Sequence, residues 1–246
     1  MDRTWTDAES EQLESADTGA VLSWAADRFA PGLAFALGFG PEGCVLLDHL
    51  ARLRLPVDVF TLDTGLLFDE TRDLWRRLEE RYGLTIRAVR PEQDLPAQAR
   101  AHGDRLWERD PDRCCALRKV GPLADALAGQ RAWISAIRRQ QTPERAGVRV
   151  LEHDAAHGLP KLSPLASWTR EQVRDYVLAN DVPVNALHAR GYPSIGCTPC
   201  TSAVLAGEDE RAGRWRGRVK TECGLHVARR VPPAELVSTS TEGAVR

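Results

Sequence analysis

Short apolar segments alternate with amphipathic segments along most of this chain, and that alternation restricts the fold more than any other feature. The segments LAFALGF (33–39) and VDVFTLD (57–63) have the composition of buried strands. A helix-period pattern lies between them, and FDETRDLWRRLEERYG (68–83) follows as an amphipathic helix with Gly83 as its stop signal. Strands that alternate with helices predict an α/β fold built on a mostly parallel sheet.

The same reading extends to both ends of the chain. A helical region is expected over 7–29, and a helix over 169–181 with Thr169 as its N-cap. Further strands are expected over residues 84–90, 132–137 and 148–154. The tail after Val231 has few large apolar residues, so we expect it to be mobile.

Composition excludes several classes of function. The 246 residues carry a net charge of −2, so there is no broad basic field and we expect no nucleic-acid partner. The N-terminus lacks the basic and apolar regions of a secretory signal, and no apolar run near it could span a bilayer. We therefore expect a cytoplasmic protein without a membrane partner. Association into a homo-oligomer stays open.

Three loops follow predicted strands, at the sheet edge where α/β proteins bind ligands. They are GFGPEG (38–43), DTG (63–65) and RRQQTPER (138–145). The first loop matches G-x-G-x-x-G, and Asp63 lies 20 residues beyond Gly43, so a dinucleotide fold is a rival from this motif alone. A tight turn without a ligand is the other alternative. Cys44, next along the chain, is most simply a small buried hydrophobe.

Two segments are strongly basic. Residues 131–149 hold five arginines against Glu144, and residues 211–220 hold four arginines and a lysine without an acid. Either segment could be a solvated surface. Arginine also binds oxyanions through its planar fork, so both could line a cleft for a compact polyanion such as a phosphate ester. The position of the first segment after a strand favours the cleft.

Four of the cysteines form two pairs along the chain, and Cys223 stands apart from them. Cys114 and Cys115 are adjacent, and Cys197 and Cys200 form a CxxC. Four cysteines suit zinc or a [4Fe-4S] cluster, whereas a disulfide or chance core cysteines are the simpler alternatives. Adjacent thiols reach one ion only with awkward backbone geometry, while a cubane offers them separate irons, so we favour the cluster. Nearby Arg118 and Lys119 could offset its negative charge.

Cys223 stands apart from both pairs, in KTECGLH (220–226), directly after the second basic segment. Positive charge lowers the pKa of a thiol and makes it a better nucleophile near neutral pH. Cys223 is therefore either a nucleophile or an exposed bystander.

These motifs converge on a known family. The chain resembles the assimilatory sulfonucleotide reductases, specifically the iron–sulfur adenylyl-sulfate (APS) reductases, over about residues 33–227. The resemblance is carried by several segments together: LDTGLLFDET, CCALRKVGPL, RRQQTPER, KLSPLASWT, ARGYPSIGCTPCTSAV, GEDERAGRW and ECGLH.

The resemblance implies a Rossmann-like α/β domain of the adenine nucleotide α-hydrolase type. It divides the chain into an N-terminal helical segment (1–30), a nucleotide- and cluster-binding domain (31–210) and a C-terminal segment (211–246). It also implies that the Cys223 thiolate attacks the sulfur of APS and that thioredoxin or a similar dithiol then releases sulfite from the cysteine S-sulfonate. The implied ligands of a [4Fe-4S] cluster are Cys114, Cys115, Cys197 and Cys200.

Substrate positions follow from the same resemblance. The anion-holding candidates are Lys119, Arg138, Arg139, Arg145, Arg211, Arg214 and His226. The nucleotide-loop candidates are Gly38, Phe39, Gly40, Asp63, Thr64 and Gly65. Keeping both cysteine pairs favours APS over its 3′-phosphorylated form (PAPS), although a PAPS or dual enzyme remains an alternative.

Two departures from the family pattern stand out. Gly38 replaces a usual serine and so removes a hydroxyl donor, while Thr142 replaces a serine and keeps one. An ATP pyrophosphatase of the same fold with a four-cysteine metal site is a further alternative, but GFGPEGC lacks the SGGxDS pattern of such enzymes. A cluster-bearing redox sensor would leave Cys223 and both basic segments without a role.

Overall fold

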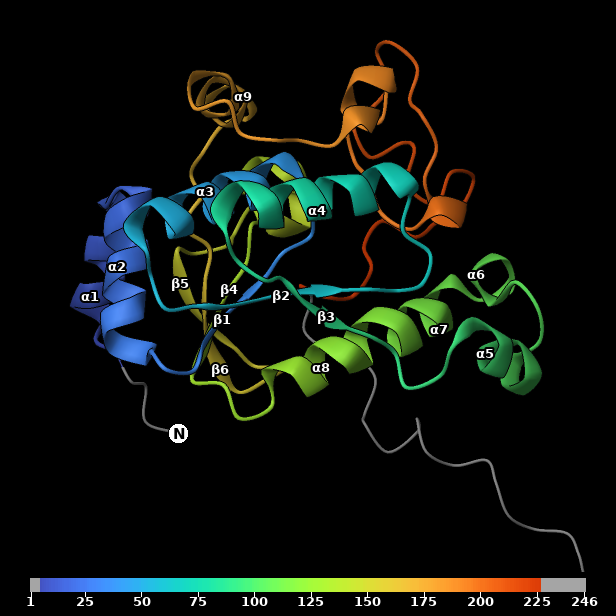
Figure 1. Cartoon of the computed structure of the whole chain (residues 1–246), viewed down its shortest axis with the longest axis horizontal. Coiled ribbons are helices and arrows are strands. Elements are labelled where there is room, and N and C mark those ends of the chain that lie inside the picture. The colour runs from blue at the N-terminus through green and yellow to red at the C-terminus, as the bar shows by residue number, and fades with distance from the viewer. Residues whose placement is uncertain (1–4, 227–246) are drawn as a thin grey trace, which may run out of the picture.

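A six-stranded sheet forms the centre of the computed structural model, which describes residues 5–226 (Figure 1). Its strand order is β3-β2-β1-β4-β6-β5. The strands are β1 (Leu33–Ala36), β2 (Asp58–Leu62), β3 (Arg87–Val89), β4 (Ala132–Ile134), β5 (Leu151–Asp154) and β6 (Leu159–Leu162).

The sheet is parallel except at one edge. Phe35 of β1 lies opposite Val59 of β2 on one side and Ile134 of β4 on the other, both in parallel register. Only β5 runs antiparallel, against β6. The expected mostly parallel α/β sheet is therefore confirmed.

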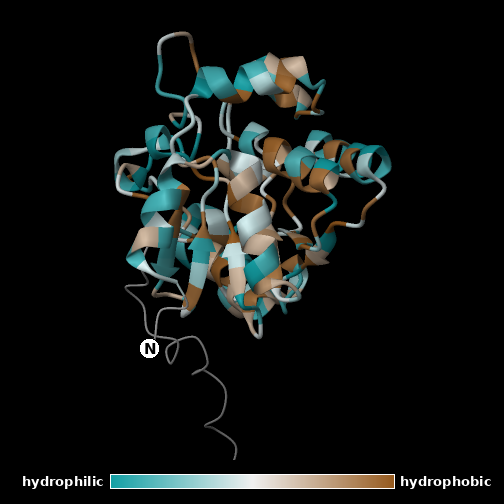
Figure 2. Cartoon of the chain, turned by 90° about the vertical axis from the view of Figure 1, so that its left-hand side faces the viewer, coloured by the Kyte–Doolittle hydropathy of each residue, from teal (hydrophilic) through white to brown (hydrophobic). Residues whose placement is uncertain are grey.

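Helices cover both faces of this sheet (Figure 1). Their bounds are α1 (Asp7–Ser15), α2 (Thr18–Phe29), α3 (Pro41–Leu53), α4 (Asp69–Tyr82), α5 (Leu95–His102), α6 (Leu106–Arg109), α7 (Pro111–Cys115), α8 (Gly121–Leu127) and α9 (Arg170–Ala179). In Figure 1, α3 and α4 lie above the strands, whereas α7 and α8 lie below them. Figure 2 shows brown, hydrophobic residues beside teal, hydrophilic ones along the helices and strands.

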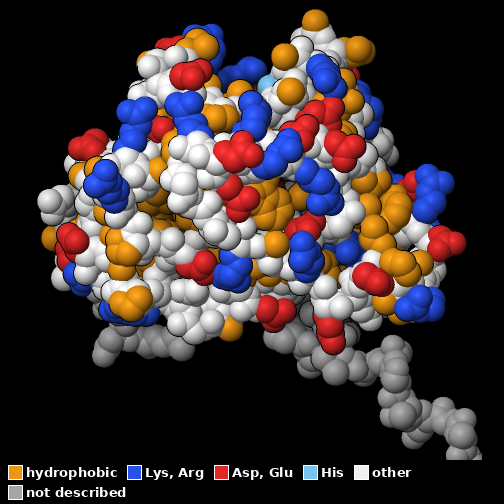
Figure 3. All heavy atoms as spheres, viewed as in Figure 1, with side chains coloured by type: hydrophobic (Ala, Val, Ile, Leu, Met, Phe, Trp, Pro, Cys, Tyr) orange, Lys and Arg blue, Asp and Glu red, His pale blue; other side chains and the backbone are white. Residues whose placement is uncertain are grey.

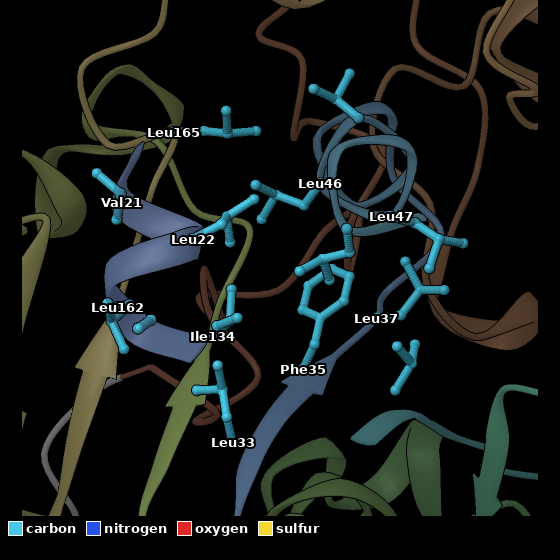
Figure 4. Close-up of a cluster of buried hydrophobic side chains, with 14 of the residues drawn as sticks. Val21, Leu22, Leu33, Phe35, Leu37, Leu46, Leu47, Ile134, Leu162 and Leu165 are labelled. Atoms are coloured by element: carbon cyan, nitrogen blue, oxygen red, sulfur yellow. The ribbon is translucent and has the colours of Figure 1, made fainter. Parts of the chain in front are cut away.

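Alternate side chains of each strand feed two hydrophobic cores, because successive residues of a strand point to opposite faces. Phe35 and Ile134 belong to the larger core with the leucines of α2 and α3 (Figure 4). Ala34 and Trp133 point the other way and pack with residues of α8, including Leu123. Burial on both faces explains why the central strands read as continuous apolar runs.

Helix ends follow the sequence signals. Gly83 takes a left-handed conformation (φ 61°) at the end of α4, and the Thr169 hydroxyl accepts the N–H of Gln172 at the start of α9. The helical region expected over 7–29 is confirmed as two helices, because the Asp17 side chain caps a new helix at Thr18.

The sequence patterns missed two parts of the fold. They gave no strand at β6 and no helices between residues 95 and 127. A π-helical turn, Ala116–Val120, joins α7 to α8 within one helical run. Such turns occur often at functional sites.

Irregular chain follows α9 and lies over the upper right of the molecule in Figure 1. It holds the short 3-10 turns Ala186–Arg190 and Thr198–Cys200, and a bridge between Thr201 and Arg214. The tail that we expected to be mobile lies outside the described residues. Across residues 5–226 we find no helix with the length and apolar character needed to cross a membrane. Side chains of both signs are interspersed on the face shown in Figure 3.

Candidate active site

A cleft of about 290 Å³ opens at the carboxyl ends of β1, β2 and β4. The chain leaves β1 toward β2 on one side and later returns to place β4 on the other, so this is the point where the strand order reverses. Ligands of open α/β sheets bind at such a point. Residues of all three predicted loops line it, which confirms that the loops lie together.

The glycine loop offers backbone N–H groups to an anion. The helix α3 begins at Gly40 without a side-chain cap, and Pro41 occupies its first turn. Its first N–H groups therefore lack intrahelical partners and carry the positive end of the helix dipole. Phe39 takes a left-handed conformation (φ 58°) with its ring packed on Trp75, which turns the loop toward the cleft. Gly38, Phe39 and Gly40 all line the cleft.

The DTG loop contributes Thr64, whose hydroxyl lies 3.4 Å from the Cys197 sulfur. Asp63 is not among the lining residues. Its buried carboxylate accepts hydrogen bonds from Arg90 (3.1 Å) and from the N–H of Gly65 (3.1 Å). In this structure Asp63 and Gly65 therefore shape the loop, and the ribose-binding role that a dinucleotide fold gives to such an acid has no support here.

The arginines of the third loop point in two directions, toward the cleft and toward α1. Arg138 lines the cleft and pairs with Glu42 of α3 at 2.8 Å, which ties this loop to the glycine loop. Arg145 also lines the cleft. Arg139 does not: it reaches Glu14 of α1 at 2.6 Å and the Val148 carbonyl at 2.7 Å.

Lys119 is the cation of the cleft with the fewest constraints. No hydrogen bond or ion pair holds its ammonium group within residues 5–226. Burial tends to lower the pKa of Lys119, but the neighbouring thiols of Cys197, Cys223 and Cys115 raise it overall. Lys119 is therefore a charged group that is ready to bind an anion.

Two arginines from the second basic segment complete the cationic wall. Arg214 stacks on the Trp215 ring at 4.6 Å, and its Nε is buried without a partner among the described residues. Arg211 pairs with Glu222 at 3.3 Å, and burial together with the charges of Arg145 and Arg214 lowers its pKa. Both guanidinium groups line the cleft.

Cys223 and His226 reach the same cleft from the C-terminal side. Cys223 is half-buried and its thiol is free. The His226 ring is stacked on Trp133, with 6.0 Å between centroids and 6° between planes. Burial, reinforced by Arg145 and Lys161, lowers the pKa of His226 well below its usual value, so the ring is neutral near pH 7.

The four remaining candidate cysteines gather beside the cleft. Cys114 and Cys115 end α7, whereas Cys197 precedes the 3-10 turn Thr198–Cys200 and Cys200 ends it. Burial, with the charges of Cys197 and Cys200, raises the pKa of the Cys114 thiol to about 11, and burial raises that of Cys115 to about 12. Within the described part of the chain, no three Cys, His, Asp or Glu side chains are grouped as ligands of a single metal ion.

Sequence reasoning missed several residues of the site. Trp133 forms part of the lining although it reads only as a strand residue. His188 also lines it: its Nδ1 lies 2.8 Å from the Tyr192 carbonyl, and its Nε2 has no partner in the described chain. His188 directly precedes the segment ARGYPSIGC, which carries part of the resemblance, and that position was the available signal. No sequence signal pointed to Glu222, next to Cys223.

Comparisons with known proteins agree with this geometry. Residues 32–203 match the family model described as the phosphoadenosine phosphosulfate reductase domain. Adenosine 5′-phosphosulfate reductase 1 of Bacillus subtilis is 47% identical over 208 residues, which cover 84% of this chain and 89% of the relative. Phosphoadenosine 5′-phosphosulfate reductase of Gloeobacter violaceus is 43% identical over 229 residues, which cover 92% and 95%.

Solved structures give the same result. A phosphoadenylyl-sulfate reductase from Candida auris in a phosphate complex superimposes with a TM-score of 0.71 at 31% identity, over 83% of this chain and all of that one. The FMN adenylyltransferase of Candida glabrata, at 15% identity and a TM-score of 0.53 over 80% of this chain and 66% of that one, shows the likeness of fold alone. The chain therefore belongs to the phosphoadenosine phosphosulfate reductase domain family, as its motifs indicated, and it is an oxidoreductase.

Proposed function

We propose that this protein reduces adenylyl sulfate to sulfite and AMP in assimilatory sulfate reduction, with Cys223 as the nucleophile. One observation carries the proposal. Cys223 follows the second basic segment, and its free thiol lines the same cleft as Lys119, Arg211 and Arg214. The curated relatives named adenosine 5′-phosphosulfate reductase support the substrate.

The first half-reaction is a displacement at sulfur. The Cys223 thiolate forms a bond to the sulfate sulfur, the bond between that sulfur and the phosphate oxygen breaks, and AMP leaves with the electron pair. An anionic nucleophile approaches an anionic group here, so the cations of the cleft must screen the phosphate and sulfate charge. Lys119, Arg145, Arg211 and Arg214 supply that screening, and the N-terminus of α3 adds backbone N–H donors.

The second half-reaction needs a dithiol. One of its thiolates attacks the Cys223 sulfur and releases sulfite, and the second thiol then frees Cys223, so the dithiol becomes a disulfide and supplies both electrons. Thioredoxin or a similar protein fits this requirement. Residues 211–246 would act as the segment that presents Cys223 to both reactants.

We further propose that Cys114, Cys115, Cys197 and Cys200 hold a [4Fe-4S] cluster. Four buried or half-buried thiols offer the right donors, and iron would displace protons that burial holds in place on Cys114 and Cys115. The adjacency of Cys114 and Cys115 favours a cubane over zinc, because a cubane spreads its ligands over separate irons. The cluster would supply charge and position beside the cleft, not electrons to the substrate.

The cellular setting follows from the same cysteines. All six are free thiols in the structure, which suits a reducing compartment, so we place the enzyme in the cytoplasm. Whether two copies associate does not affect the proposed chemistry, since every residue invoked belongs to one chain.

Sulfite release tests the proposal directly. Anaerobically purified protein with thioredoxin receives APS or PAPS in parallel, because a relative named for PAPS is 43% identical. We expect sulfite from APS, little from PAPS, and none from the Cys223→Ser variant with its iron retained. Sulfite from both substrates would keep the chemistry and make the enzyme a dual reductase. Full turnover by Cys223→Ser would reject the assignment of the nucleophile.

A further inference from the structure

A carboxylate lies behind the cationic wall of the cleft. Glu222 contacts Arg145 at 2.9 Å and Arg211 at 3.3 Å, so it bridges the two basic segments of the chain. The three side chains are 10%, 11% and 19% exposed, respectively. An ion pair with so little water around it is expensive to break on one side, because an uncompensated buried charge remains.

The Glu222 carboxylate does not occupy the space in which a substrate anion would bind. Arg145 and Arg211 line the cleft, whereas Glu222 does not. Each guanidinium group therefore meets Glu222 on one side while it can still face the cleft on the other. A carboxylate in this position fixes the direction of flexible arginine side chains, so that a bound substrate is held in the reactive geometry.

Glu222 also immediately precedes Cys223, whose thiol does line the cleft. Consecutive Cα atoms lie about 3.8 Å apart, so an anchored residue leaves its neighbour little freedom. The adjoining chain is held as well: Arg211 donates to the Thr221 carbonyl at 2.7 Å, and Lys220 pairs with Asp112. Among these anchors, Glu222 is the one whose charge meets both Arg145 and Arg211.

We propose that Glu222 is a positioning residue for the first half-reaction: its carboxylate aligns Arg145 and Arg211 and, through them, holds the Cys223 thiol over the sulfur of the bound substrate. The inference rests on the function proposed above. It assigns to Glu222 no contact with the substrate. It therefore predicts a loss of reaction rate without a matching loss of anion affinity.

The experiment compares three variants of the full chain with wild type. Glu222→Gln removes the charge, and Glu222→Asp keeps the charge on a side chain shorter by one methylene. Glu208→Gln is the matched control, because Glu208 pairs with Arg216 of the second basic segment at 2.8 Å and does not line the cleft. Iron content and circular dichroism check that each variant is folded and loaded.

Three quantities are measured for each variant. Mass spectrometry follows the single-turnover rate at which APS adds an SO₃ group to Cys223 in the absence of a dithiol. Calorimetry gives the dissociation constant of AMP, and peptide mapping gives the rate of Cys223 alkylation by iodoacetamide. Misplacement of a reacting group by about 1 Å can cost about 100-fold in rate, so we expect a 10- to 100-fold slower S-sulfonation in Glu222→Gln.

The pattern expected for positioning is specific. In Glu222→Gln the AMP affinity and the alkylation rate should not fall, because the cations and the thiol both remain and a nearby negative charge is lost. Glu222→Asp should react faster than Glu222→Gln, and Glu208→Gln should match wild type. Equal S-sulfonation rates in Glu222→Gln and Glu208→Gln would overturn the inference, and so would AMP affinity that falls in step with the rate. Wild-type protein that forms no S-sulfonate would instead overturn the proposed function.

Discussion

A serine at position 38 should strengthen nucleotide binding. Gly38 lines the cleft, and a Cβ placed on it would meet no atom within 4 Å. Its backbone is not left-handed, so a side chain adds no strain there. The Gly38→Ser variant would therefore carry a hydroxyl donor beside the N-terminus of α3, where we expect the phosphate of the nucleotide.

The magnitude follows from one added hydrogen bond. A net contribution of about 1 kcal/mol corresponds to an affinity that is about 5-fold tighter. The backbone effect of removing a glycine must be separated from that of the hydroxyl, because it stabilises the folded chain by about 0.4–1 kcal/mol through the unfolded state. Gly38→Ala supplies that control, since it has the Cβ without the oxygen.

Calorimetric titration with AMP at fixed salt measures the effect. We expect Gly38→Ser to bind AMP about 5-fold more tightly than Gly38→Ala, and Gly38→Ala to bind as the wild type does. Equal affinities in the two variants would show that position 38 does not face the phosphate. Weaker binding in both would show that the cleft needs the glycine itself, and the argument from open space would then be wrong.

Three further predictions test separate parts of the site. Gly196→Ala would place a Cβ in steric clash with the Arg214 guanidinium, so the arginine should leave the cleft. The KM for APS should then rise about 10-fold or more, while the melting temperature stays close to that of wild type. An unchanged KM would count against Arg214 as an anion ligand. Cys200→Ser should lose iron, because a cluster ligand is removed. Its AMP affinity should stay within about threefold of wild type, because Cys200 does not line the cleft. Full iron retention would remove Cys200 from the ligand set. Burial lowers the pKa values of His188 and His226, so the unfolded chain takes up protons near pH 6.5 that the folded chain refuses. The free energy of unfolding in urea should therefore decrease as the pH falls from about 7 to about 5, by at most about 1.4 kcal/mol per pH unit for each histidine, and a flat profile would contradict the burial argument.

The central strands could be predicted because burial on both faces leaves an unambiguous apolar run. The strand β6 could not, since Pro160 and Lys161 occupy its middle. Lys161 is 4% exposed, and its charge is balanced by Glu152 at 2.8 Å while its ammonium lies over the Trp133 ring. A buried lysine is acceptable only with such partners, and partners from another strand are not visible in a local pattern.

The site could be predicted where residue type and loop position sufficed. It could not be predicted where the direction of a long side chain mattered. Loop position placed Arg138 and Arg145 at the cleft, but nothing local shows that Arg139, between them in the chain, turns to Glu14. Likewise Asp63 stands where a ribose-binding acid would, yet Arg90 holds its carboxylate. The partner of a long side chain depends on tertiary neighbours, and these are fixed only once the whole sheet has formed.

The cysteine pairs and the cleft are parts of one packed unit. The π-helical turn after Cys115 carries Arg118, which is 4% exposed and donates to the Thr64 carbonyl at 2.6 Å. Thr64 in turn contacts the Cys197 sulfur, and Lys119 follows Arg118 into the cleft. Anything bound to the cysteines would therefore lie against the DTG loop and next to Lys119, the cation that we propose for the substrate anion. Under the proposed function, a cluster at these cysteines would act through charge and position beside Lys119, since the dithiol would supply both electrons.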